Sequence, residues 1–428
     1  MNGGAASEQV TLTERGVDGA VRATMNVNLS SGGFFQTDDV LGSLGLPLGA
    51  FGPITIDSAS GLPLTVVSEV RSTNGTAGFY GGRSRTEASI ERVIPEAIDS
   101  GVRGDSGTFR TNLGVNNLSS ALANVRVSLI DTAGATRGTF DLTVNPFGMT
   151  QIDGITRRIL GANSSTPGYL KLTSDQAIHA WASKIDNGTD DPSFEIAIGQ
   201  SAVESGPRLL IPSVVRNSRF TSSLTLINRD STQTANYTVT ARSTDGAQLA
   251  TIAGQLGPGA AYRTADVLTD LGIAGEPFGP LSIDTTQAVA LAAASEVRSA
   301  SGTAGFFPAV SLSSAAVQKL VPEIVDTGDR GVAGTFRTNL GLNNVGPEEA
   351  RVRLELVGSG GNVLGATTVQ VPSKGLKQID NVARLVLGQA GATSVRGYIR
   401  VLSSQPMHVW ASKIDNGTDD PSIVMGSP

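Results

Sequence analysis

The chain lacks several of the residues on which common catalytic and metal sites depend. Its 428 residues include no Cys and two His, and Phe, Trp and Tyr together make up 5%. The absence of Cys excludes disulfide bonds and thiolate metal sites, and two His residues cannot form a His-rich metal centre. No paired-carboxylate motif, Gly-x-Ser-x-Gly elbow or phosphate-binding loop is evident. We therefore expect no enzyme activity, no catalytic or cofactor-binding residues, no cofactor and no metal site.

Long apolar runs and concentrated charge are also missing. No stretch approaches the roughly 18 apolar residues that a membrane-spanning helix needs, so no membrane span is expected. The net charge of -6 is spread along the chain without a basic stripe, which argues against nucleic acid as a partner. Residues 1–4 do not resemble a signal peptide, so the leader of an exported form would not be part of this chain.

What the sequence does contain is a long internal repeat. Ser68–Phe79 returns nearly unchanged as Ser295–Phe306, a shift of 227 residues. Trp181–Ser193 returns as Trp410–Ser422, a shift of 229. Self-similarity at a fixed spacing indicates a modular architecture.

Each of the two long repeats is itself double, because Phe220–Asn228 and Phe336–Asn344 follow the same plan. We predict four modules of two alternating types in the order A-B-A-B. The short, polar joints between them favour a stiff rod. We name the four segments A1 (residues 1–82), B1 (residues 88–203), A2 (residues 206–310) and B2 (residues 316–428).

Within each module apolar residues alternate with polar ones. Phe109–Val115 and Val125–Leu129 place apolar side chains at every second position, the pattern of a strand with one buried face. Further short strands are expected at Tyr169–Leu172 and Ile178–Ile185, with a turn at Ser174-Asp175 between them. About seven short strands per module are typical of an all-β, immunoglobulin-like sandwich.

One short helical turn is expected in each module. Each stretch begins with an acidic residue and is followed by Gly, which is ordinary capping chemistry. The four predicted turns are Asp38–Leu44, Asp153–Leu160, Asp266–Leu271 and Asp380–Leu387.

The order of the motifs resembles a known kind of repeat. Ile211-Pro212 precedes a Phe-x-Thr-x-Leu-x-Leu-x-Asn type of strand, followed by Asp-x-Val-x-x-x-Leu-Gly and then Ala-Ser-x-Ile-Asp-Asn-x-Thr-x-Asp-Pro. This order is similar to the tandem all-β repeats, immunoglobulin- or fibronectin-like, of secreted and surface-displayed proteins of environmental bacteria. The resemblance covers essentially the whole chain. It implies β-sandwiches outside the cell or at its surface, and it implies no catalytic residues, because these proteins are largely uncharacterised.

A1 departs from this pattern at its beginning. Gln9–Thr13 aligns with Asn236–Thr240, which places Met1 at Asn228 and leaves no counterpart of Ile211–Ile227. The loss of two strands exposes apolar side chains and unpaired backbone edges. Three interpretations stay open: the chain is a piece whose first strands lie upstream, A1 closes by rearrangement against B1, or another subunit inserts a strand.

The two histidines occupy equivalent places in the B segments. His179 and Trp181 flank one residue on a predicted strand and share a face, as do His408 and Trp410. Such a pair could form a ligand-stacking patch. We favour packing or a contact between modules, because buried aromatic and His side chains more often serve structure.

Two loops are rich in oxygen ligands. Asp186–Asp191 includes Asp190, and its counterpart Asp415–Asp420 includes Asp419. Calcium favours six to eight oxygen ligands, but the spacing does not fit an EF-hand, and Asn-Gly followed by Asp-Asp-Pro is also what a tight turn needs. We favour the turn.

The late strand carries opposite charges in the two module types. Glu69 and Arg71 in A1 correspond to Lys184 and Asp186 in B1. If these strands face one another across a module boundary or between chains, Glu meets Lys and Arg meets Asp.

These observations favour a non-enzymatic, extracellular structural or adhesive protein, the subunit of a surface filament that assembles by strand addition or end-to-end contacts. Its partners would be copies of itself or other surface proteins. The alternative is a carbohydrate- or polymer-binding accessory region of a larger secreted enzyme, with extracellular polysaccharide as the partner. The low aromatic content ranks this second.

Overall fold

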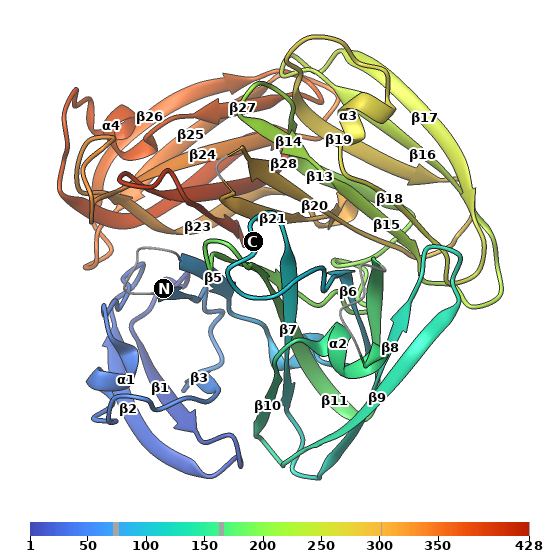
Figure 1. Cartoon of the computed structure of the whole chain (residues 1–428). Helices are drawn as coiled ribbons and strands as arrows, with labels where there is room; N and C mark the ends of the chain where they lie inside the picture. The colour runs from blue at the N-terminus through green and yellow to red at the C-terminus, as the bar shows by residue number, and fades with distance from the viewer. Residues whose placement is uncertain (72–76, 162–166, 301, 428) are drawn as a thin grey trace.

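A computed structural model describes residues 1–71, 77–161, 167–300 and 302–427 (Figure 1). The protein is all-β, with four α-helical turns among the described residues. A1 contains β1 (Glu8–Arg15), β2 (Val21–Leu29), α1 (Val40–Ser43), β3 (Ile54–Ser58), β4 (Val67–Arg71) and β5 (Ala77–Gly81), and the 3-10 turn η1 (Arg85–Glu87) follows it. B1 contains β6 (Ser89–Ala97), β7 (Phe109–Asn117), β8 (Ala123–Ile130), β9 (Thr136–Val144), β10 (Met149–Ile152), α2 (Ile155–Leu160), β11 (Gly168–Asp186) and β12 (Pro192–Ile196).

The second half repeats this order and adds strands at its start. A2 contains β13 (Arg208–Val215), β14 (Phe220–Ser222), β15 (Leu224–Asn228), β16 (Ala235–Arg242), β17 (Gln248–Leu256), β18 (Ala261–Thr264), α3 (Val267–Asp270), β19 (Phe278–Thr285), β20 (Leu291–Ser299), β21 (Ala304–Pro308) and β22 (Val310–Ser311), followed by η2 (Leu312–Ser314). B2 contains β23 (Ala316–Asp326), β24 (Phe336–Asn344), β25 (Ala350–Val357), β26 (Val363–Val371), β27 (Leu376–Ile379), α4 (Val382–Leu387), β28 (Val395–Asp415) and β29 (Pro421–Met425).

The helical turns lie where the sequence predicts them, but only two begin on the expected acidic residue. The carboxylates of Asp39 and Asp266 accept hydrogen bonds from the first backbone amides of α1 and α3. α2 and α4 begin at Gly154 and Asn381, which adopt left-handed backbone conformations and make no side-chain cap. The prediction of an acidic N-cap was therefore wrong for the B segments, but the predicted Gly161 and Gly388 do end α2 and α4 in left-handed conformations. No helix in the described part of the chain is long and apolar enough to cross a bilayer.

Each B segment is one continuous sheet instead of two separate ones. The first part of β11 pairs with β6 and β8, and its later part pairs with β7 and β12. The predicted turn at Ser174-Asp175 was wrong, because β11 runs through these residues as one strand. The carboxylate of Asp175 accepts hydrogen bonds from the backbone and side-chain nitrogens of Asn124 at 2.8 and 2.6 Å. β28 repeats this arrangement in B2, and in both segments the sheet wraps its own apolar core.

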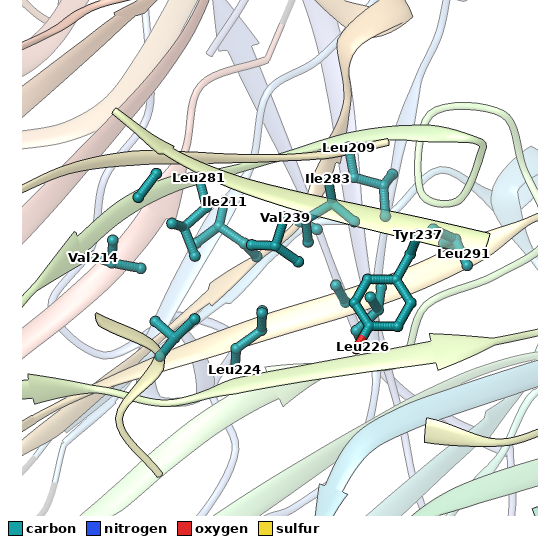
Figure 2. Packing of buried hydrophobic residues seen from close by; sticks show 14 of the residues in the cluster. Leu209, Ile211, Val214, Leu224, Leu226, Tyr237, Val239, Leu281, Ile283 and Leu291 are labelled. Atoms are coloured by element: carbon teal, nitrogen blue, oxygen red, sulfur yellow. The ribbon is translucent and has the colours of Figure 1, made fainter. Parts of the chain in front are cut away.

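A2 encloses its core between two sheets. One has the order β17-β16-β19-β13-β22 and the other β14-β20-β15-β18, with β21 beside β20. Figure 2 shows side chains of β13 and β15 meeting those of β16 and β19 in this core. A1 has the corresponding strands β2-β1-β3 and β4-β5, and the described residues contain no counterpart of β13, β14 or most of β15.

The four segments close on themselves, so the expected rod was wrong (Figure 1). The hydroxyl of Tyr398 in B2 donates to Gly32 O in A1 at 2.9 Å, and Tyr169 in B1 donates to Gly259 O in A2 at 2.8 Å. The joints between the segments are short, as expected, but the chain closes because the same contact between a B and an A segment forms twice, between B1 and A2 and between B2 and A1. The closing contact brings Thr65 within 2.7 Å of Ser427, near the two ends of the chain.

Two repeated glycines make room for the repeated tryptophans. A Cβ on Gly114 would lie 2.1 Å from the Trp181 ring, and one on Gly341 would lie 1.9 Å from the Trp410 ring. Trp410 is 3% exposed. A side chain at Gly114 would therefore displace the partly buried Trp181 ring, and one at Gly341 would displace the buried Trp410 ring.

We expect Gly341→Ala to lower the free energy of unfolding by about 1 to 3 kcal/mol through overpacking. Gly257→Ala is the matched control, since a Cβ there meets no atom within 4 Å. Urea unfolding followed by Trp fluorescence measures both variants. Equal stability of the two variants would contradict this account of the glycine.

Candidate functional site in the open first segment

The repeated His-Trp pairs lie at contacts between segments, where the pair of B2 is buried and the pair of B1 is partly buried. Trp181 makes an edge contact with Tyr80 of A1, with ring centroids 5.2 Å apart, and Trp410 makes the same contact with Phe307 of A2 at 5.0 Å. The Nε2 of His179 lies 3.0 Å from Ser84 O at the joint before B1. These pairs serve contacts between segments, as we favoured, and Trp410 and His408 are each 3% exposed.

The oxygen-rich loops are turns in which the carboxylates of Asp186 and Asp190 already accept hydrogen bonds. An oxygen of Asp186 accepts from the amides of Gly188 and Thr189 at 2.8 and 3.1 Å. Asp190 has a φ of 58° and accepts from Arg110 at 2.9 Å. Asp419 repeats both features with Arg337. Among the described residues no His, Asp and Glu side chains gather in a group that could hold a metal ion.

The expected Glu–Lys contacts across segment boundaries are confirmed. The ammonium of Lys184 lies 2.7 Å from Glu96 of its own segment and 2.8 Å from Glu296 of A2. Lys413 lies 3.2 Å from Glu323 of its own segment and 2.9 Å from Glu69 of A1. Each lysine is therefore shared between two segments.

The expected Arg–Asp contacts are replaced by stacking. Arg71 lies over the ring of Phe336 with its guanidinium carbon 4.3 Å from the ring centre. Arg298 lies over Phe109 at 4.0 Å. A guanidinium on an aromatic face is favourable because the ring face is electron-rich, so the arginines hold the same boundaries by a different interaction.

The boundary between B1 and A2 also contains buried carboxyl groups, of which the sequence pattern marked only Asp191, in the loop Asp186–Asp191. Burial opposes ionisation of Glu96, but Lys184 and Arg263 outweigh it and lower its pKa to about 2. Burial and the charge of Glu96 raise the pKa of Glu195 well above its ordinary value, and burial together with Asp186 raises that of Asp191 to about 7. All three are at most 5% exposed, so they are sealed from a substrate. The positions of Glu96 and Glu195 follow from tertiary packing, and no local motif marks them.

The first two residues of A1 stand where β15 ends in A2. The amine of Met1 donates a hydrogen bond to Thr65 O at 2.9 Å, and Thr65 N donates one to Met1 O. In A2 the residue that corresponds to Thr65 is Ala292, and it pairs with Ile227. The side-chain amide of Asn2 donates to Ser30 O, as that of Asn228 donates to Gly257 O. Met1 thus corresponds to Ile227, one residue before the sequence alignment.

The inner face of A1 is open where A2 is filled. Leu281, Ile283 and Leu291 are all 0% exposed in A2. Their counterparts Ile54, Ile56 and Leu64 are only partly buried. We call this surface the open face; it also includes Val40, Leu41 and Leu44, which are likewise only partly buried.

Two sheet edges border the open face. β3 pairs with β1 and β4 pairs with β5, and neither has a second partner strand among the described strands. Their counterparts β19 and β20 pair on their other sides with β13 and with β14 and β15. Unpaired edges beside an apolar surface are a template for an additional strand.

Comparisons with known proteins do not identify the chain. No family model matches it and no curated protein is similar to it. Among solved structures, the crystal structure of Thermotoga maritima 1070 is similar at 14% identity, covering 26% of this chain and 96% of that one with a TM-score of 0.23. Similarity at this level carries no argument about fold or activity.

The shared lysines give a prediction about closure. Lys413→Met leaves Glu69 and Glu323 together in a site where their side chains are 17% and 16% exposed, so we expect the free energy of unfolding to fall by about 3 to 5 kcal/mol. Arg126→Met is the control, because its pair with Asp141 is more than half exposed and contributes about 0 to 1 kcal/mol. Urea unfolding measures both, and similar losses would contradict the prediction.

A charge exchange tests whether sign complementarity is what matters. We expect the double variant Glu69→Lys/Lys413→Glu to recover most of the stability that Glu69→Lys alone loses, because opposite charges again meet at the boundary. Small-angle scattering should show a larger radius for the single variant than for the double one. No recovery in either measurement would refute the role of charge pairing.

His408 predicts a loss of stability in acid. Burial lowers the pKa of His408 from 6.5 to about 4. Between pH 6.5 and about pH 4 the imidazole is therefore protonated in the unfolded chain but neutral in the folded one. The free energy of unfolding therefore falls as the pH falls through this window, by up to about 3 kcal/mol. His408→Gln should lose less stability than the unsubstituted protein between neutral pH and about pH 4, measured by urea unfolding. Parallel pH profiles would count against it.

Proposed function

We propose that the protein is a non-enzymatic, extracellular structural or adhesive repeat protein that assembles through strand addition at A1. Its finer architecture in this proposal is four sandwich-like modules in A-B-A-B order, with the sheet of each B module continuous through β11 or β28. The location outside the cell rests on the resemblance of the repeats to those of surface-displayed proteins. The contrast between A1 and A2 supports the assembly role, because the strands that the two segments share have two unpaired edges and an open apolar face in A1 but not in A2.

The closed arrangement favours strand addition over end-to-end contacts. An end-to-end filament would need free terminal modules, but A1 and B2 are engaged with each other through Lys413 and Tyr398. The open face of A1 remains as the surface where an additional strand gains both backbone hydrogen bonds and apolar burial.

Polysaccharide binding has less support. Sugar-binding sites use exposed planar aromatic rings, whereas Trp181 packs on Tyr80 and Phe194 and Trp410 packs on Phe307. The residues that would serve a sugar therefore hold segments together.

Immunogold labelling of intact cells that make the protein tests this proposal. We expect label at the surface in extended assemblies. Ile56→Asp places a charge on the open face and should leave the label at the surface but dispersed, while Asp57→Asn on the exposed side of the same strand should behave as the unsubstituted chain. Label confined to permeabilised cells, or assemblies unaffected by Ile56→Asp, would refute it.

A further inference from the structure

We propose that the exposed face of the B2 sheet carries a binding site for an oxyanion of the sulfate or phosphate type, built around Arg351 and Arg353. The site lies over β25, β26 and β28 (Figure 1). It includes no residue of the open face of A1, and it goes beyond the proposed assembly role. The comparison of B2 with B1 carries the proposal, because the same strands present different charges on this face in the two segments.

A shallow hollow of about 400 Å³ lies on this face. Arg351 and Arg353 line it from β25 and are exposed, and they share one side of the strand because alternate residues point the same way. Thr368 lies directly across from Arg353 on β26, and Gln318 and Ser404 complete the polar rim. The described residues that line the hollow include two guanidinium groups and no carboxylate.

The positive charge of this face is only partly neutralised. Glu355 is shared by two arginines, Arg353 at 2.8 Å and Arg400 at 3.1 Å. The backbone nitrogen of Arg351 donates to Ser404 Oγ at 2.9 Å, but its guanidinium forms no ion pair or hydrogen bond with any residue that the structure describes. Three guanidinium groups are therefore balanced by a single carboxylate.

The corresponding face of B1 is balanced by acidic residues. Three of them are replaced by uncharged residues in B2. The corresponding pairs are Glu91 and Gln318, Asp141 and Thr368, and Asp175 and Ser404.

Each of these acids of B1 already has a partner on the sheet. Asp141 lies across from Arg126, the counterpart of Arg353, and pairs with it at 2.8 Å. Glu91 pairs with Lys171 at 3.0 Å. B2 lacks these carboxylates and has Arg351 where B1 has the uncharged Asn124. The difference between the two segments is thus a gain of unbalanced guanidinium groups on one surface.

Guanidinium groups on alternate strand residues suit an oxyanion. Each presents a planar fork of N–H donors that pairs with two oxygens of a sulfate or phosphate group. Alternate Cα atoms of a strand are about 7 Å apart, so the long side chains of Arg351 and Arg353 can reach one group together. The amide of Gln318 and the hydroxyls of Thr368 and Ser403 supply neutral donors around it.

The same features disfavour nucleic acid as the ligand. The net charge of the chain is -6, and the unbalanced arginines occupy one short stretch of sheet, whereas nucleic acid is bound along a longer basic track with aromatic rings that stack on bases. None of the described residues that line the hollow is aromatic. Two sources share the favoured chemistry: the free ion, and an ester on a polysaccharide, whose charge is recognised without a stacking ring.

Isothermal titration of the full chain with sodium sulfate, at an ionic strength held constant with sodium chloride, provides the first test. We expect saturable, one-to-one binding. Arg351→Gln should weaken it by at least about tenfold, because a charge-assisted pair is lost, and should not alter unfolding, since the side chain is exposed and has no partner to lose. Arg126→Gln is the matched control in B1 and should bind as the unsubstituted chain does.

A second variant removes the site while both arginines stay in place. Thr368→Asp puts a carboxylate across from Arg353, as Asp141 lies across from Arg126 in B1, and should weaken sulfate binding by at least about tenfold. Thr139→Asp changes the net charge equally on the exposed face of B1 and should have no effect. Absence of sulfate binding, or equal effects within either pair of variants, overturns the inference.

Competition distinguishes the two sources of the ligand. Displacement of sulfate by dextran sulfate but not by uncharged dextran, lost in Arg351→Gln, supports the inference and identifies an ester on a polymer. Sulfate binding that dextran sulfate does not displace supports it and identifies the free ion. Displacement by uncharged dextran, or stronger displacement by duplex DNA than by dextran sulfate, overturns the assignment of the ligand.

Discussion

The closed arrangement depends on a buried lysine that neutralises carboxylates from two segments at once. Lys184 and Lys413 are 6% and 5% exposed and each lies between one Glu of its own B segment and one of an A segment. A buried charge without its partner is strongly destabilising. Each lysine therefore ties a B segment to an A segment, and the second of these contacts closes the molecule.

The same boundary explains how A1 keeps its shape with a small core. A1 has three buried apolar residues in its own cluster, but β5 lies against β12 and β29. Phe79 belongs to the core of B2, and Tyr80 packs on Phe194 of B1. Neighbouring segments thus bury apolar side chains of A1, a role that the additional strands β13, β14 and β15 have in A2. The open face is held in place by this packing, and a preformed edge lowers the ordering cost of adding a strand.

Local patterns predicted the strands well and failed where a distant contact competed. The alternation in Phe109–Val115 is enough to specify a strand, since its inner residues meet a core. Ser174-Asp175 has the composition of a turn, yet Asn124 binds Asp175 and the strand continues. The sequence alignment placed Met1 one residue too late, because the loop before β1 is one residue shorter than the corresponding loop in A2. The repeat spacing was measured on residues after this loop, so it does not show the difference in loop length.

The sequence alone determined the all-β character, the repeat and the Glu–Lys complementarity, because alternation and duplication are local features that can be read along the chain. The tertiary structure decided that the segments close instead of extending, that the arginines stack on Phe109 and Phe336, and that Met1 completes the end of a strand. These outcomes depend on which surfaces meet in space. Glu69 and Lys413, for example, are separated by most of the chain and come together only when the chain folds.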